Sequence, residues 1–74
     1  MRNTLKNARR ASGLRLRDVA EITGITLRHY QRIEAGTRAG SYELWQTLEA
    51  FFGIPRDVLR NDTEIIPNAA KKDD

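Results

Sequence analysis

The sequence predicts a small all-α domain. Three observations support this prediction: apolar residues recur at helical spacing, glycines separate the apolar segments at short intervals, and no stretch alternates Val, Ile and Thr as a β-strand does. The chain has 74 residues, enough for one domain with a compact core. We expect this domain to span residues 1–60 and the remainder, residues 61–74, to be a mostly flexible tail.

The first two helices are expected at residues 4–12 and 16–23. One face of the first carries Leu5, Ala8 and Ser12, and Gly13 follows as a left-handed C-cap. The second segment follows the i, i+3, i+4, i+7 spacing of a single helix face with Leu16, Val19, Ala20 and Thr23. Gly24 ends this segment after about two turns.

The second and third helices are expected to form one helix-turn-helix unit. Thr26 is a good N-cap for a third helix at residues 27–35. The small side chain of Ala20 lets the two helices approach closely, and Ile25 and Ile33 hold them together.

Two further helices and a tail complete the chain. Ser41 is a suitable N-cap for a fourth helix at residues 42–52, which supplies most of the core through Trp45, Leu48 and Phe52. Pro55 suits the first position of a short helix ending near residue 60, because proline lacks only an N–H that has no partner there. In the polar tail, Ile65 and Ile66 form an apolar pair before Pro67. This pair could dock onto the domain or onto a protein partner, and the sequence does not distinguish the two.

Composition excludes several kinds of site. The absence of cysteine rules out disulfides, thiolate nucleophiles and Cys-containing zinc sites, and one histidine cannot build a His-rich metal site. The chain has no apolar run near the roughly 20 residues that span a bilayer, and its Arg-rich start lacks the apolar segment of a signal peptide. We find neither a Gly-rich phosphate loop nor a catalytic triad order. We therefore expect a cytoplasmic protein that is not an enzyme and uses no cofactor or metal.

Positive charge is concentrated in the first half of the chain. Nine Lys or Arg stand against three acids in residues 1–38, whereas four stand against seven in residues 39–74. This separation favours a surface that faces a polyanion, because neutralised phosphates release their counterions. Eight of the nine cations are Arg, which suits forked contacts to phosphate or guanine. Charge alone is equally compatible with a solvated surface.

The segment GLRLRDVAEITGITLRHYQRIEAG resembles the Cro/repressor-like, XRE-type family of helix-turn-helix regulators. Family framework positions are occupied in order from Leu5 to Leu59 by Gly13-Leu14, Val19-Ala20, Gly24-Ile25-Thr26, Arg32-Ile33-Glu34, Gly36, Ser41, Leu48, Phe52-Gly53-Ile54 and Asp57. The resemblance implies a compact five-helix bundle of the lambda-repressor-like type. It also implies that the third helix enters the DNA major groove and that a homodimer reads a pseudo-palindromic operator.

Candidate DNA contacts follow from the resemblance and from the faces of the third helix. The candidate base contacts are Leu27, Arg28, Gln31 and Arg32. The candidate phosphate contacts are Arg15, Arg17, Thr26, Thr37 and Arg38, with Arg9 and Arg10 as weaker candidates. An ordinary exposed helix face is the alternative for these residues. His29 stays open between exposed surface, phosphate contact and neutral filler. Glu34 is expected to be structural, pairing with an Arg of the first helix.

The sequence departs from the family pattern at three positions. Arg15 and Leu16 stand where many relatives have Ser or Thr followed by Gln, and Glu49 stands at a position that is usually small and apolar. Arg15 cannot cap the second helix through an oxygen, which we expect to cost about 1 kcal/mol.

Three functions remain open at this stage. The first is a stand-alone transcriptional repressor of a phage, plasmid or other mobile element, and the second is an antitoxin that binds DNA and a toxin. The third is a protein-interaction module that has kept the fold. An exposed stripe containing Tyr42 and Phe51, together with Val58, is considered as a dimer contact.

Overall fold

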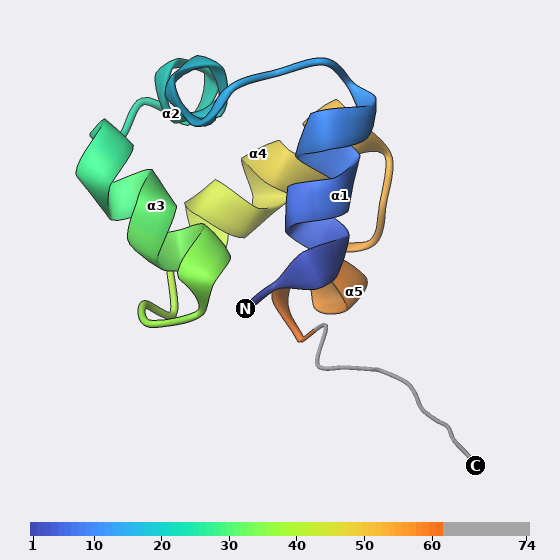
Figure 1. The fold of residues 1–74 in the computed structure, drawn as a ribbon. Helices are drawn as coiled ribbons and strands as arrows, with labels where there is room; N and C mark the ends of the chain where they lie inside the picture. The colour runs from blue at the N-terminus through green and yellow to red at the C-terminus, as the bar shows by residue number, and fades with distance from the viewer. Residues whose placement is uncertain (62–74) are drawn as a thin grey trace, which may run out of the picture.

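The computed structural model describes residues 1–61, which form five helices and no strand (Figure 1). The helices are α1 (Asn3–Ala11), α2 (Leu16–Thr23), α3 (Leu27–Ala35), α4 (Tyr42–Phe52) and α5 (Arg56–Arg60). The predicted all-α class is thereby confirmed. Within residues 1–61, no helix has the length and apolar character needed to cross a membrane. The predicted tail, with Ile65, Ile66 and Pro67, lies outside the described residues from position 62 onward.

The predicted boundaries of α2, α3 and α4 agree with the structure, and those of α1 and α5 shift by one residue. Helix α1 begins at Asn3 and ends at Ala11. Pro55 is the N-cap of α5 rather than its first helical residue, with φ −52° and ψ 136°. A ψ in this extended range places proline just outside the helix, so the first residue of α5 is Arg56.

One hydrophobic core joins all five helices. The largest fully buried side chains are Leu5, Val19, Tyr30, Ile33, Trp45, Leu48 and Leu59. In the view of Figure 1, α4 runs behind α1 and α3, and α5 lies below α1. Each helix is therefore held by apolar burial, which stabilises short helices that would be marginal alone.

A buried ion pair connects α1 to α3. Nε of Arg9 donates to Oε2 of Glu34 at 2.9 Å and Nη2 donates to Oε1 at 3.1 Å, with side-chain exposures of 10% and 6%. The hydrogen bond to Glu34 raises the pKa of Arg9, although burial opposes this shift. Nη1 of Arg9 also donates to the carbonyl oxygen of Leu14 at 2.9 Å. The predicted structural role of Glu34, paired with an Arg of the first helix, is confirmed.

This pair changes the expected inner face of α1. The sequence indicated Leu5, Ala8 and Ser12, but Ser12 is exposed and Arg9 is buried beside Leu5. An arginine can occupy this inner position because Glu34 satisfies both its charge and two of its hydrogen-bond donors.

The exposed aromatic residues do not form the single stripe considered from the sequence. Tyr42 and Phe51 are 60% and 47% exposed, as is Val58 at 48%. Nine positions of an α-helix correspond to about 2.5 turns, so Tyr42 and Phe51 leave α4 on opposite sides. The ring of Tyr42 is also covered by the guanidinium of Arg56, whose Cζ lies 4.9 Å from the ring centroid.

We predict that Arg9→Ala destabilises the domain by about 3–5 kcal/mol, because it leaves the Glu34 carboxylate buried without its partner. The double variant Arg9→Met/Glu34→Leu removes both charges and should recover most of that loss. Urea unfolding followed by circular dichroism measures both values. A double variant no more stable than Arg9→Ala would contradict this account.

Candidate nucleic-acid interface

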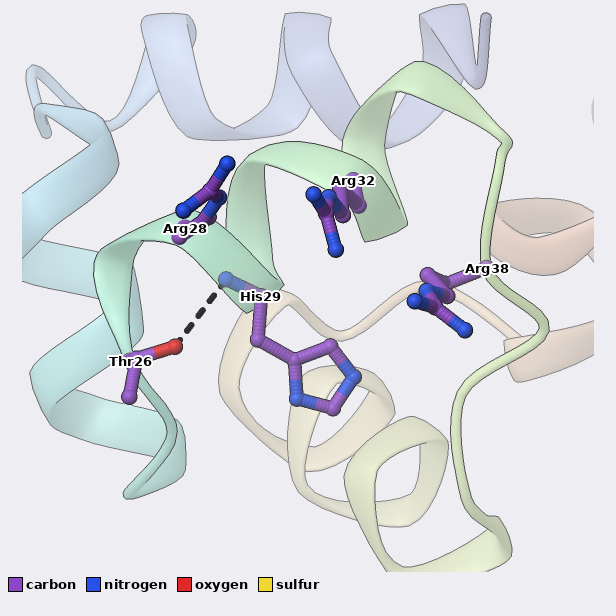
Figure 2. A pocket seen from close by; sticks show the side chains of 5 residues that line it. All are labelled: Thr26, Arg28, His29, Arg32 and Arg38. Carbon is purple, nitrogen blue, oxygen red and sulfur yellow. Dashed lines mark hydrogen bonds between the residues drawn. The ribbon is translucent and has the colours of Figure 1, made fainter.

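The turn between α2 and α3 fixes the orientation of α3 relative to α2. Gly24 adopts φ +75°, and the N–H of Ile25 donates to the carbonyl of Ala20 at 3.1 Å. A left-handed φ favours glycine, so the turn depends on this residue. Oγ1 of Thr26 then accepts a hydrogen bond from the N–H of His29 at 3.0 Å and caps α3 (Figure 2).

Helix α3 has an inner and an outer face. Its inner residues Tyr30, Ile33 and Glu34 are buried. Burial raises the pKa of Tyr30 well above its usual range, and Glu34 adds to the shift, so the phenol stays protonated. The outer face carries the four candidate base contacts: Leu27, Arg28 and Gln31 are exposed, and Arg32 is half-buried. Figure 1 shows α3 at the edge of the bundle.

One side of α3 borders a cationic hollow, which we call the arginine hollow. It has a volume of about 310 Å³ and is lined by Thr26, Arg28, His29, Arg32 and Arg38. Figure 2 shows the guanidinium groups of Arg28 and Arg32 along α3, with Arg38 on the following loop and the imidazole of His29 among them. Because the lining includes three arginines and no carboxylate, this hollow suits an anionic ligand.

A second hollow borders the other side of α3, and we call it the inter-helix hollow. It has a volume of about 370 Å³ and is lined by Arg9, Arg15, Leu16, Arg17, Leu27 and Gln31. The candidate base contacts are therefore divided, with Leu27 and Gln31 on this side and Arg28 and Arg32 on the other. The sequence predicted that these four residues share one face of α3. It did not predict their division between two hollows, because that division depends on how α2 and the loop after α3 pack.

The candidate phosphate contacts also fall on both sides. Arg15 and Arg17 line the inter-helix hollow, whereas Thr26 and Arg38 line the arginine hollow. Thr37 is exposed outside the two hollows, and its Oγ1 donates to the carbonyl of Arg32 at 3.3 Å. Four of the five candidates are thus brought together with the candidate base contacts.

Helix α2 begins without a side-chain cap from its N-cap residue. The side chain of Arg15 is 83% exposed and makes no capping hydrogen bond, since a guanidinium has no acceptor atom. Instead, Oδ2 of Asp18 accepts from the backbone N–H of Arg15 at 2.8 Å, which is one half of a capping box. An acid three positions after the N-cap was the available sequence signal for this contact. The sequence around α2 therefore keeps an exposed cation where most helices have a capping oxygen.

The loop between α3 and α4 is held against Trp45. Nε1 of Trp45 donates to the carbonyl of Ala39 at 2.8 Å. Gly40 adopts φ +79°, and a Cβ there would lie 2.7 Å from Nε1 of Trp45 and 3.0 Å from a side-chain carbon of Leu44. A side chain at this position would collide with Trp45 and Leu44, and the positive φ also favours glycine, so glycine lets the loop backbone lie close against Trp45.

Glu49 also has a defined structural role. Its carboxylate accepts from the N–H of Arg56 at 3.2 Å and from Nη1 of Arg56 at 3.1 Å. The acid at this usually apolar family position therefore joins α4 to the first turn of α5.

A comparison with family models matches residues 5–59 to the helix-turn-helix family. The matched segment contains all five helices except the first two residues of α1 and the last residue of α5. Neither curated proteins nor solved structures gave a match.

We predict that Arg15→Ser stabilises the domain by about 1 kcal/mol, because serine supplies the missing cap of α2. The matched control is Arg17→Ser, which removes an exposed charge from the first turn of α2, inside the helix and not at the N-cap position. Thermal unfolding of the three proteins measures the difference. A lower stability for Arg15→Ser than for Arg17→Ser would contradict the assignment of Arg15 as an uncapped N-cap.

Proposed function

The chain belongs to the helix-turn-helix family of DNA-binding regulators, and from this premise we propose that it is a sequence-specific transcriptional repressor that reads the major groove with α3. The observation that carries the proposal is the outer face of α3, which lies between two hollows lined by arginine. Repression requires only that an operator be occupied, which is the simplest outcome of binding by such a domain.

The dimensions of α3 suit the proposed groove. An α-helix with its side chains is about 10–12 Å in diameter, which matches the width of about 12 Å of the major groove of B-DNA. The nine residues of α3 extend over about 13.5 Å. Arg28 and Arg32 lie one turn apart on the same side, so both guanidinium groups can face the base edges.

The chemistry of the outer face suits direct reading of bases. Arg28 and Arg32 can each donate two hydrogen bonds to N7 and O6 of guanine, and Gln31 can pair with adenine. The apolar side chain of Leu27, which is 37% exposed, can contact a thymine methyl group.

The two hollows suit the two sugar-phosphate backbones that border the groove. On one side we propose phosphate contacts from Arg15 and Arg17, and on the other from Thr26 and Arg38. We propose a further phosphate contact from Thr37, which is exposed outside both hollows. Contacts on both sides would fix the depth and direction of α3 in the groove, which base contacts require.

A homodimer on a pseudo-palindromic operator is part of this proposal. One short helix contacts only a few base pairs, and helix-turn-helix proteins commonly gain specificity by placing two copies on half-sites about one helical turn apart. The experiment is selection of duplexes from a random library at moderate salt, followed by sequencing of the retained pool. A pseudo-palindrome with that spacing is the expected result. Recovery of only salt-sensitive, sequence-blind binding would overturn the proposal in favour of a protein-interaction module.

We predict that Arg28→Ala and Arg32→Ala weaken binding to the selected operator by about 1–3 kcal/mol more than binding to random DNA, because each removes a base-specific pair. The matched control is Arg60→Ala, an exposed arginine at the end of α5, which should leave both affinities unchanged. Fluorescence anisotropy with both DNAs measures the difference. Equal losses on the two DNAs would identify the residue as a phosphate contact.

We predict a different signature for Arg17→Ala. Loss of one phosphate contact should weaken binding to operator and random DNA alike and reduce the slope of log K against log salt concentration by about 0.9. Titrations at four salt concentrations measure the slope. An unchanged slope would remove Arg17 from the set of phosphate contacts.

A further inference from the structure

Arg2 connects three segments that are far apart in the sequence. Its Nε donates to the carbonyl of Arg60 at the end of α5, at 2.8 Å. Its Nη1 donates to the carbonyl of Ile33 in α3 and, at 2.8 Å, to the carbonyl of Arg38 in the loop after α3. Its backbone N–H donates to the carbonyl of Glu34 at 2.9 Å. The residue before α1 thus binds the ends of two helices and the loop at once.

The guanidinium of Arg2 also lies over the ring of Trp45, with Cζ 4.9 Å from the ring centroid. This distance is within the range of a cation–π contact. Trp45 in turn holds the neighbouring carbonyl of Ala39. The loop is therefore fixed at two successive carbonyls, one by Arg2 and the next by Trp45.

We propose that Arg2 is a positioning residue for the DNA interface, holding the backbone of Arg38 so that its side chain stays in the arginine hollow. This inference rests on the proposed function. The side chain of Arg38 shares that hollow with Arg28 and Arg32, and like charges at close range repel one another. An unrestrained loop would let Arg38 move away before DNA arrives. Fixing the loop in advance removes an ordering cost from binding.

The geometry requires arginine rather than any cation. Two nitrogens of one planar group reach three carbonyls, and the flat face covers an aromatic ring. A lysine at this position keeps the charge but has a single nitrogen, so it cannot make the same set of contacts. This difference separates a positioning role from a direct contact of Arg2 with DNA phosphate, which lysine would preserve.

The test is a double-mutant cycle on the selected operator with Arg2→Ala, Arg38→Ala and their combination, together with Arg2→Lys. If Arg2 acts through Arg38, Arg2→Ala weakens binding by roughly 3–10-fold in the natural background and by less than about twofold when Arg38 is already alanine. Arg2→Lys should weaken binding nearly as much as Arg2→Ala. Equal losses in the two backgrounds, or full binding by Arg2→Lys, would overturn the proposal.

A second measurement needs no DNA and distinguishes a local effect of the Arg2 substitutions on the loop from a general destabilisation of the domain. The N–H of Thr37 donates to the carbonyl of Arg32 at 3.0 Å, and its hydrogen exchange should become faster in Arg2→Ala and Arg2→Lys, while exchange in α2 stays as in the natural protein. A uniform increase in all helices would show general destabilisation and would overturn the positioning role. If the natural protein selects no operator, the proposed function fails; if it does and the Arg2 variants bind equally well, only this inference fails.

Discussion

Arg9 of α1 and Glu34 of α3 form a buried ion pair with two hydrogen bonds. The placement of α2 and α3, the two helices that border the candidate interface, depends on this pair. The same guanidinium holds the carbonyl of Leu14 in the segment between α1 and α2. One side chain therefore sets the start of α2 and the inner face of α3 relative to α1. Since a buried charge without its partner is strongly unfavourable, arrangements that separate these two residues are disfavoured.

Local signals in the sequence were sufficient for the helices and for the two faces of α3. Capping residues such as Thr26 and Ser41, and glycines at positive φ such as Gly24, mark helix ends through interactions within a few residues. The tertiary contacts left weaker signals. Arg2 binds backbone carbonyls, which every residue has, so its partners could not be predicted. The division of the outer face into two hollows likewise depends on packing between separate segments.

The start of α2 shows a compromise between stability and surface charge. A capping serine or threonine would satisfy an N–H at this end, whereas Arg15 places an exposed cation at the border of the inter-helix hollow. Asp18 compensates in part by accepting the N–H of Arg15. The N-cap of α2 thus lacks the preferred capping oxygen at a site where positive charge serves the proposed function. Such departures from helix preferences are expected at functional sites.

The separation of inner and outer residues on α3 has a consequence for evolution. Tyr30, Ile33 and Glu34 hold the helix to the core, whereas Leu27 and Gln31 on the outer face take no part in that packing. Exchanges on the outer face therefore leave the scaffold intact. Under the proposed function, descendants of one ancestral gene could acquire different target sequences through a few codon changes. Glu34 is joined to Arg9 of α1 by the ion pair, so a change at either residue of this pair requires a matching change at the other.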